Sequence, residues 1–396
     1  MSAPGREVVL APGREKSLEK RHPWIFSGAV HSVGKDLRDG DVVDVVDTDG
    51  KFRARGILNR KSQILVRVLS FSSEDTVDDA FLSARVKQAV SRRHGAVTRL
   101  VHAESDRLPG LVADRYGDFA VVQLSSLGLD LRRDVLVRAL AEKTGVRGVF
   151  ERSDVDGRKK EGLEDRVGLA FGEAPPELLQ VPERTHDGRT VTLLVDVRRG
   201  HKTGAYLDQA DNRRAIARRA NGARVLNAFS FAGAFGLHAA AAGAAEVVNV
   251  DSSPEALALS ERTAAENGVA EKIRHVRADV FEEFRRLRAA GETFDVIVVD
   301  PPKLAHSPSH VDRAARAYKD LARLAFHLAR PGGIVACFSC SGAVTPTLFQ
   351  QIVWSGSLEA QREAQIVERL SQPEDHPVLL TFPEGEYLKG LVCRVL

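Results

Sequence analysis

The sequence predicts a multidomain protein that begins with a small β-domain, continues through a mixed α+β region and ends in an α/β domain with a parallel sheet. Its 396 residues are enough for two or three domains that each bury a core. Short β-runs separated by turn signals fill residues 41–71, and strands alternate with helices from Arg224 onward. The second pattern is typical of βαβ units.

The first two regions differ in their periodicity. An acidic, polar stretch at residues 73–79 predicts a boundary between them. Two β-runs precede this stretch, at residues 42–46 and 64–69. A helix is predicted after it at 80–94, and a strand at 120–124. The second region is therefore expected to be mixed α+β.

The α/β region opens with a strand at 225–229 and a helix at 234–242. The next helix should begin after Ser253, because serine is a good N-cap and Pro254 suits the first helical position. Further strands are predicted at 247–250, 273–276, 294–299 and 334–338, with a closing pair of strands within 378–395.

Several classes of protein are excluded by composition. With 43% hydrophobic and 28% charged residues, the chain is an ordinary globular one, and its most apolar stretch, 225–250, is too polar for a membrane span. The amino-terminal residues show no hydrophobic segment typical of a signal peptide, so we expect a cytoplasmic protein with no membrane partner. Three cysteines are a poor disulfide framework for this length, and we expect no metal site.

Charge is distributed unevenly although the net charge is only +3. Lys and Arg outnumber Asp and Glu by 13 to 9 in residues 1–72. A second basic concentration lies before the α/β motifs and consists of Arg198, Arg199, Lys202, Arg213, Arg214, Arg218 and Arg219. Two interpretations stay open: contacts to a polyanionic substrate, or a solvated helix face over 213–219.

Ligands of such sheets bind outside the carboxyl ends of the strands. Gly233 and Gly236 follow the first strand and permit close approach of backbone to a ligand, although they do not form a dinucleotide GxGxxG. Asp251 ends the second strand, where a carboxylate can accept hydrogen bonds from both ribose hydroxyls. Asp279 occupies the matching place after the third strand, where a carboxylate could accept a hydrogen bond from an adenine amine. Together they predict a cofactor that contains adenosine.

The most specific signal is Asp300-Pro301-Pro302-Lys303 after the fourth strand. Two prolines stiffen this corner and leave Asp300 at the mouth of the site. A rigid corner of this kind can bind the edge of a base flipped out of its stack.

The cysteines spell a C-x-x-C, but it is not expected to bind metal. In an extended strand Cys337 and Cys340 point to opposite faces, so both cannot reach one ion. Cys337 and Cys393 are expected in the core. Cys340 lies beyond the apolar run and is a candidate nucleophile if a nearby cation such as Lys303 favours its thiolate.

The motifs in combination resemble the bacterial large-subunit ribosomal RNA cytosine-5 methyltransferases over nearly the whole chain. They are residues 21–28 (RHPWIFSG), 200–209 (GHKTGAYLDQ), 300–303 (DPPK), 338–342 (FSCSG) and 387–390 (YLKG). The resemblance implies a β-barrel-like PUA RNA-binding domain at 1–72, a central α+β domain at 73–190 and a Rossmann-like methyltransferase domain at 191–396. It also implies 23S ribosomal RNA as substrate and S-adenosylmethionine as cofactor; a homodimer is conceivable.

The resemblance also implies roles for matching residues. Cys340 would be the nucleophile, Asp300 would bind the base beside the cofactor, and Lys303 would assist catalysis. Cofactor contacts would come from Asn227, Phe229, Gly233, Gly236, Asp251, Asp279 and Asp300. RNA contacts would come from Arg21, His22, Trp24, Arg198, Arg199 and Lys202. A thiol is needed because cytosine C5 is too weak a nucleophile until a thiolate adds to C6.

Alternatives remain at this point. Many RNA cytosine-5 methyltransferases carry a second cysteine in the strand-four motif, where this chain has Asp-Pro-Pro-Lys. The base that removes the C5 proton is therefore open between Glu384 and a water held by Lys303. An exocyclic-amine methyltransferase would leave Cys340 incidental, and a noncatalytic RNA-binding protein would fail to bind S-adenosylmethionine. A nicotinamide-dependent dehydrogenase is disfavoured because GxGxxG is missing.

Overall fold

The computed structural model describes residues 7–305 and 307–396, so the first six residues of the predicted PUA domain lie outside the described part. The chain forms two compact units. The first contains the described residues up to Leu179 together with Val195–Leu207 and Glu374–Gly385. The second contains Gln180–Leu194, Asp208–Pro373 and Glu386–Leu396.

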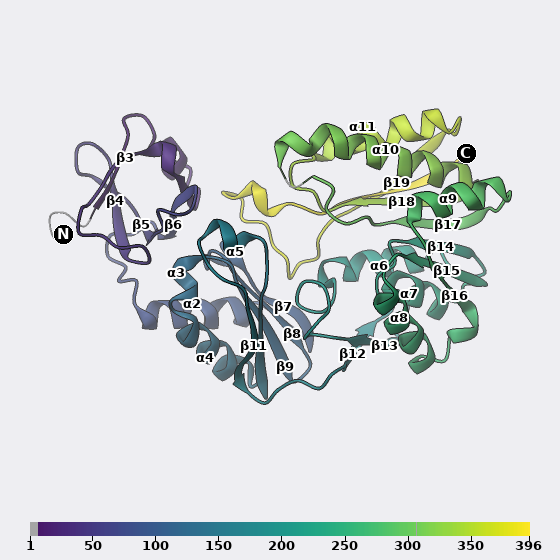
Figure 1. The fold of residues 1–396 in the computed structure, drawn as a ribbon, viewed down its shortest axis with the longest axis horizontal. Coiled ribbons are helices and arrows are strands. Elements are labelled where there is room, and N and C mark those ends of the chain that lie inside the picture. The colour runs from purple at the N-terminus through teal and green to yellow at the C-terminus, as the bar shows by residue number, and fades with distance from the viewer. Residues whose placement is uncertain (1–6, 306) are drawn as a thin grey trace. The chain divides into compact units, whose positions relative to one another are not determined.

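The first unit begins with a six-stranded sheet of order β2-β6-β5-β4-β1-β3 (Figure 1). Its elements are β1 Glu7–Leu10, α1 Lys16–Glu19, β2 Trp24–Phe26, β3 Val30–Val33, β4 Val42–Val46, β5 Phe52–Leu58 and β6 Ile64–Ser70. Alternate residues such as Val8, Val43 and Val66 form a buried core of their own. The expected small β-domain is therefore present.

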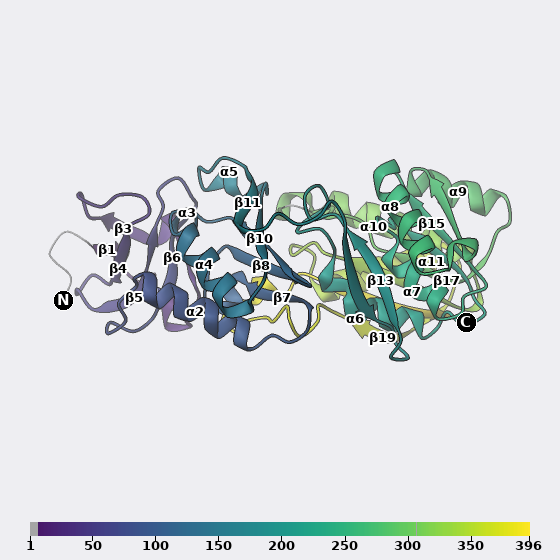
Figure 2. The same cartoon turned by 90° about the horizontal axis from the view of Figure 1, so that it is seen from below.

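A five-stranded sheet of order β11-β10-β9-β8-β7 follows in the same unit. Helices α2 and α4 pack side by side against it and bury Leu82, Val86 and Leu136 (Figure 2). The elements are α2 Asp79–Ser91, β7 Val97–His102, β8 Leu111–Tyr116, β9 Phe119–Leu124, α3 Leu127–Asp130, α4 Arg133–Thr144, β10 Gly148–Ser153, α5 Gly157–Lys160 and β11 Arg166–Gly172.

The second unit is built on a seven-stranded sheet of order β16-β15-β14-β17-β18-β20-β19, in which only β19 and β20 run antiparallel to their neighbours. Its elements are α6 Ala210–Ala217, β14 Arg224–Ala228, α7 Ala234–Ala241, β15 Glu246–Asp251, α8 Pro254–Glu266, β16 Ile273–Arg277, α9 Val280–Ala289, β17 Phe294–Val299, α10 Val311–Leu328, β18 Ala329–Ser339, α11 Pro346–Glu359, β19 Ala364–Leu370 and β20 Lys389–Val395. A two-stranded sheet, β12 Leu179–Arg184 and β13 Thr190–Val195, belongs to this unit except for its end residues Leu179 and Val195.

Helices cover both faces of the seven-stranded sheet. Helices α9, α10 and α11 contribute to one core, and α6, α7 and α8 contribute to the other (Figure 1). The central strand β17 is buried on both sides, as its continuous apolar run predicts. Such a three-layer arrangement leaves the carboxyl ends of the parallel strands free to form a site.

Local signals predicted most element boundaries in this unit. Ser253 caps α8 by accepting a hydrogen bond from the Ala256 amide, with Pro254 at the first helical position. The closing pair of strands within 378–395 was a wrong prediction, because only β20 lies there and its partner β19 occurs earlier, at Ala364–Leu370. The polar edge strand β19 lacks the apolar run on which the prediction depended.

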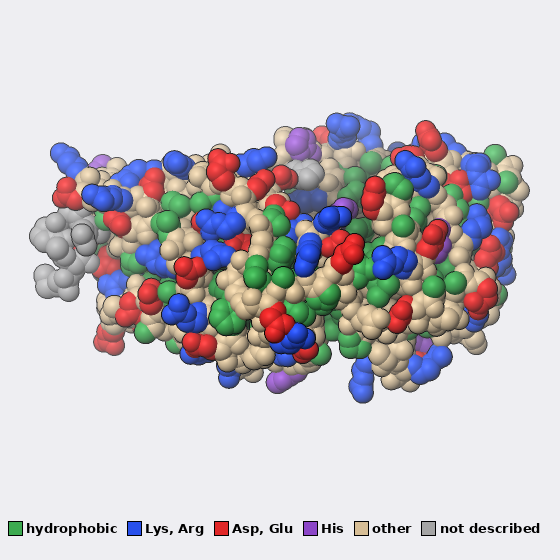
Figure 3. Space-filling view, turned by 60° about the horizontal axis from the view of Figure 1, so that its bottom comes forward, with side chains coloured by type: hydrophobic (Ala, Val, Ile, Leu, Met, Phe, Trp, Pro, Cys, Tyr) green, Lys and Arg blue, Asp and Glu red, His purple; other side chains and the backbone are tan. Residues whose placement is uncertain are grey.

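Within the described part of the chain, no helix is long and apolar enough to cross a membrane. The same residues contain no group of three or more His, Cys, Asp or Glu side chains placed to hold a metal ion. Figure 3 shows Lys and Arg side chains interspersed with Asp and Glu over one face, so charge of one sign does not dominate there.

Candidate active site

The carboxyl ends of five parallel strands, β14 to β18, bring the predicted cofactor and catalytic residues to one end of the second unit's sheet. The register pairs Ala228 with both Val250 and Val299, and pairs Val299 with Cys337. These strands therefore end within about two residues of one another in the register. Phe229, Asp251 and Asp300 lie at this end of the sheet, and Cys340 lies beyond the end of β18.

The loop after β14 has an unusual backbone. Phe229 and Phe231 both have left-handed φ values, of 57° and 47°, and Gly233 follows with φ 74°. Such values cost a non-glycine residue on the order of 1–3 kcal/mol and persist only where the surroundings fix them. Asp251 supplies part of this constraint, because its carboxylate accepts a 2.7 Å hydrogen bond from the Phe231 amide. The Asp251 hydrogen bond therefore stabilises the left-handed conformation of this loop.

The two glycines of this loop pack against a buried amide. A Cβ on Gly236 would lie 2.3 Å from Asn249 Oδ1, and one on Gly233 would lie 2.0 Å from Ser260 Oγ. Asn249 in turn accepts a hydrogen bond from the Asn227 side chain and donates one to Ser260. Asn227 and both glycines therefore build the base of the loop, whether or not they also contact a ligand.

The strand ends are suited to an adenosine cofactor. The Ser230 hydroxyl is buried in this loop and, among the described residues, no hydrogen-bond partner is found for it. Asp251 is partly exposed and spends one lone pair of each carboxylate oxygen on the Phe231 and Ser253 amides, leaving others for ribose hydroxyls. Asp279 is exposed and caps α9 by accepting from the Glu282 amide.

The next strand end positions Asp300. Its carboxylate accepts a 2.9 Å hydrogen bond from the Gln209 side chain, and Gln209 is held by Asn212 at 2.6 Å. Lys303, three residues beyond, is exposed. The stiff corner therefore presents an anchored carboxylate and a solvent-facing amine.

Hydroxyl groups fix the segment that carries Cys340. Tyr318 Oη lies 3.0 Å from Ser339 Oγ and 3.1 Å from Ser341 Oγ, and the Ala305 amide donates to Ser341 Oγ. Burial raises the pKa of Tyr318, although the serine hydrogen bonds oppose this, so its phenol stays neutral at ordinary pH. This network joins the loop after β17 to the end of β18.

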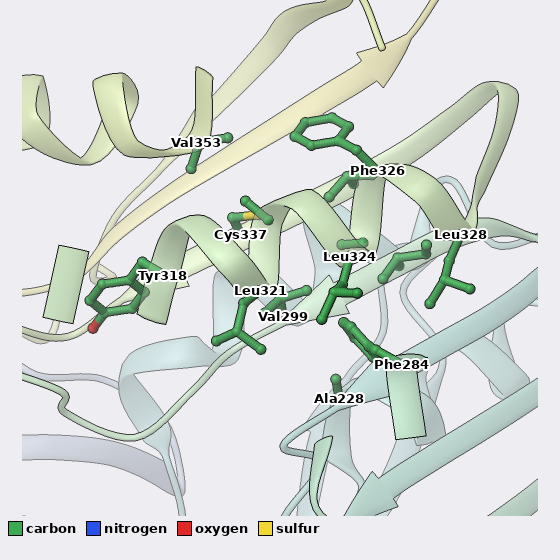
Figure 4. Packing of buried hydrophobic residues seen from close by; sticks show 14 of the residues in the cluster. Ala228, Phe284, Val299, Tyr318, Leu321, Leu324, Phe326, Leu328, Cys337 and Val353 are labelled. Atoms are coloured by element: carbon green, nitrogen blue, oxygen red, sulfur yellow. The ribbon is translucent and has the colours of Figure 1, made fainter. Parts of the chain in front are cut away.

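The three cysteines lie in different environments. Figure 4 shows Cys337 among Leu321, Val353 and other core side chains, where burial raises the thiol pKa well above its usual range. Burial likewise raises the pKa of Cys393 to about 11. Cys340 is only partly buried and packs against the core on the other face of the sheet. The opposite-face prediction is confirmed, so the C-x-x-C spacing does not bring the two thiols together.

All three RNA-contact candidates near the amino terminus make contacts within the first unit. The Trp24 indole donates a 2.8 Å hydrogen bond to Glu104 and its ring lies 4.7 Å from that of Phe382. His22 Nε2 lies 3.3 Å from Glu384 Oε2. Arg21 is exposed, with its guanidinium over the Phe71 ring. Glu384, one candidate for the C5 base, is thus placed in the first unit beside His22.

The segment Val195–Leu207 of the first unit carries the other RNA-contact candidates. Arg152 donates to the Val197 and Gly200 carbonyls, and Thr203 donates a 2.6 Å hydrogen bond to the buried Asp114. These contacts fix the segment's backbone while Arg199 and Lys202 stay exposed. Arg198 is also exposed, and its guanidinium donates to the Pro175 carbonyl.

The interpretation of residues 213–219 as a solvated or RNA-facing basic helix face is wrong for Arg213, whereas Arg218 is exposed and Arg214 and Arg219 are partly exposed. Arg213 is buried and pairs with Glu183 at 2.7 Å. Arg218 and Arg219 both pair with Glu368, and Arg214 pairs with Asp211. Because carboxylates pair with these arginines, and Glu183 and Glu368 are distant from them in sequence, the charge count alone was misleading.

Known proteins resemble this chain over almost its entire length. A PUA-like domain model matches residues 8–71, and a model of S-adenosylmethionine-dependent methyltransferases matches residues 177–392. A protein named ribosomal RNA large subunit methyltransferase I, from Aeromonas hydrophila subsp. hydrophila, is 48% identical over 395 residues, which is 98% of either chain. The chain belongs to the ribosomal RNA large subunit methyltransferase I family. A member from Shewanella amazonensis is also 48% identical, over 98% of this chain and 99% of its own length.

Solved structures agree with this family assignment at the level of fold. A Streptococcus mutans protein assigned as a SAM-dependent methyltransferase superposes with a TM-score of 0.83 at 22% identity, over 98% of this chain and all of its own. A second, solved in complex with SAH, gives 0.84 at 22% identity with the same coverage. The predicted family and multidomain fold class, and the S-adenosylmethionine dependence, are confirmed.

Sequence reasoning about this methyltransferase domain missed residues whose partners are distant in sequence. Gln209 and Lys389 were recognised only as parts of motifs, although Gln209 holds Asp300 and Lys389 contacts the Ser341 carbonyl. Asn249 and Tyr318 were not recognised at all. A polar residue within an apolar strand, as in residues 246–251, was the available signal for Asn249.

Proposed function

We propose that this protein methylates C5 of a cytosine in 23S ribosomal RNA through a covalent bond between Cys340 and C6 of the base. The relatives are named as large-subunit ribosomal RNA methyltransferases, and the PUA-like domain is suited to RNA. The observation that carries the proposal is the contrast among thiols. Cys340 alone of the three cysteines lies partly exposed beyond the strand ends, at the end of the sheet that also carries Asp300 and the glycine loop.

The chemistry assigns a separate task to each catalytic side chain. The Cys340 thiolate forms a bond to C6, which moves electron density into the ring and makes C5 nucleophilic. Asp300, oriented by Gln209, binds the N3 edge and shares a proton with it, which stabilises that density. After C5 is alkylated, its proton leaves to a water held by Lys303, and the C6–sulfur bond breaks to restore the aromatic ring and the Cys340 thiolate.

The cofactor would be held by the loop that follows β14. S-adenosylmethionine supplies an electrophilic methyl group on a sulfonium centre. Phe229, the Ser230 hydroxyl and the backbone around Gly233 and Gly236 would hold its methionine part, and the remaining contacts would come from Asp251 for the ribose, Asp279 for the adenine and Asp300 beside the methyl group. A loop whose left-handed backbone is stabilised by the Asp251 hydrogen bond would need less ordering on binding than an unrestrained one.

RNA would be held by exposed cationic side chains, some of which lie on the segment Val195–Leu207, whose backbone is held by hydrogen bonds. Arg21, Arg199 and Lys202 are exposed and suit phosphate contacts. Trp24 and His22 already contact Phe382 and Glu384, so we propose that they shape the RNA surface rather than stack on bases. A homodimer stays a prediction.

The test is identification of the methylated nucleoside. Ribosomal RNA from a strain lacking the enzyme is incubated with the full chain and S-adenosylmethionine, digested and analysed by mass spectrometry. The proposal predicts 5-methylcytidine in the large-subunit RNA. A product methylated on the exocyclic amine, with full activity in Cys340→Ala, would contradict it.

A further inference from the structure

A buried lysine lies against the segment that carries Cys340. Lys389 begins β20, is 6% exposed and pairs in antiparallel register with Ser339 of β18. Its Nζ donates a 2.8 Å hydrogen bond to the Ser341 carbonyl. Since Cys340 lies between Ser339 and Ser341, the ammonium reaches along the backbone turn that presents the thiol.

The charges around this lysine come from several elements. Burial lowers the pKa of Lys389 and Lys303 adds to this, whereas Cys340 and Glu386 raise it. The charge interaction with Cys340 is reciprocal, so a protonated Lys389 favours the thiolate form of the cysteine. Tyr318 faces the same turn from α10 but is a neutral phenol. Lys389 is therefore a buried cation whose charge interacts with the Cys340 thiol.

We propose that Lys389 is a positioning residue that keeps Cys340 ionised at neutral pH. The inference deepens the proposed function, because the thiolate is the species that attacks C6. In the ionisation step the S–H bond of Cys340 breaks and its proton leaves to solvent, while the ammonium keeps its own protons and compensates the new negative charge. Lys389 forms no bond to the base.

The location of Lys389 explains why it acts more strongly than Lys303. The Lys303 side chain is exposed, and water screens a charge at such a position. The Lys389 ammonium is withdrawn from solvent and held by the Ser341 carbonyl, so its field at Cys340 is less screened. The sequence offered Lys303 as an example of such a nearby cation, and we assign the role to Lys389 instead.

The pH dependence of Cys340 alkylation tests the proposal. Iodoacetamide is reacted with the full chain between pH 5.5 and 9.5, and the Cys340 peptide is quantified by mass spectrometry. Cys337 and Cys393 are buried, with raised thiol pKa values, so they contribute little signal. Lys389→Met should raise the midpoint by about one pH unit, so alkylation at pH 6.5 slows about tenfold. Lys389→Arg should keep the midpoint close to that of the wild type.

Controls make each outcome decisive. Lys319→Met removes a surface lysine on α10 and should leave the midpoint unchanged. The proposal is overturned by equal midpoints in wild type and Lys389→Met, or by a shift of the same size in Lys319→Met or Lys303→Met.

A second measurement keeps the proposal testable if Lys389→Met does not fold. Thiolate absorbance at 240 nm is titrated in wild type and corrected with Cys340→Ala. A midpoint below the ordinary thiol value of about 8.5 supports the proposal, and one at or above it refutes the proposal. Neither experiment uses RNA or cofactor, so failure here is distinct from failure of the methylation assay.

Discussion

The two halves of the carboxyl end of the sheet in the second unit are built by different physical means. On the cofactor half, after β14 and β15, the backbone defines the shape through left-handed residues and glycines packed on Asn249. On the chemistry half, after β17 and β18, side chains define it through Gln209, Tyr318 and Lys389. Substitutions on the first half should therefore change stability and cofactor affinity together, whereas those on the second should change reactivity while the fold persists.

The two cysteines of β18 give the largest expected difference. Cys340→Ala should reduce methyl transfer to background while the free energy of unfolding changes by less than about 0.5 kcal/mol. Cys337→Ala should retain transfer but lose about 1 kcal/mol of stability, because it leaves a small cavity in the core. Methyl transfer and urea denaturation of both variants measure this contrast. Substantial methyl transfer by Cys340→Ala would contradict the assignment of the nucleophile to the half after β17 and β18.

A buried ion group of Arg213 on α6, Glu183 on β12 and His238 on α7 should affect both halves alike. Arg213→Met leaves Glu183 buried with only His238 beside it, and such a loss costs about 3–5 kcal/mol. The variant should unfold at a lower denaturant concentration and should transfer methyl groups more slowly. A variant as stable as the wild type would show that this pair does not anchor α6.

The same ion group should make the free energy of unfolding decrease at acid pH. Burial would raise the pKa of Glu183, but Arg213 and His238 outweigh it and lower the pKa to about 2. Because the folded pKa lies below the ordinary value, this stabilisation is present above about pH 4.5 and is lost as pH falls toward 2. Glu183→Gln should flatten the dependence of the unfolding midpoint on pH in this window. An unchanged slope would assign the loss of stability at acid pH to other carboxylates.

Glycines distinguish the halves at an intermediate scale. Gly236→Ala should cost about 1–3 kcal/mol and weaken S-adenosylmethionine binding, because the new Cβ meets a hydrogen-bonded amide that has nowhere to move. Gly342→Ala, on the chemistry half, meets nothing within 4 Å and should stay within about 0.5 kcal/mol of wild type. Calorimetry and denaturation compare the two. Equal stability would show that the cofactor half is more adaptable than its packing indicates.

Strand-end acids give the most specific contrast, because two similar substitutions should differ in their effect on stability. Asp251→Asn keeps one acceptor oxygen but turns an amide N–H toward the Phe231 or Ser253 amide, which should cost about 1–3 kcal/mol. Asp279→Asn should change stability by only a few tenths of a kcal/mol, since asparagine is an equally good N-cap. Urea denaturation of both variants would contradict the account if they lost the same stability.

The sequence predicted the parts of the molecule that depend on local signals. The order of strands and helices from β14 to β18, the N-cap of α8 and the separate faces of Cys337 and Cys340 follow from residues close in the chain. The roles of Arg213 and Lys389 could not be predicted, because a basic residue on a helix or at a strand start is usually exposed. Their partners, Glu183 and the Ser341 carbonyl, are brought together only by folding.

Covalent trapping tests the central claim most directly. The full chain and S-adenosylmethionine are incubated with ribosomal RNA fragments that contain 5-fluorocytosine, whose fluorine blocks release after addition to C6. The account predicts a protein–RNA band that survives denaturation in wild type and in Cys337→Ala and is missing in Cys340→Ala. Transfer to unmodified RNA without any such band would contradict it and leave Cys340 a structural residue.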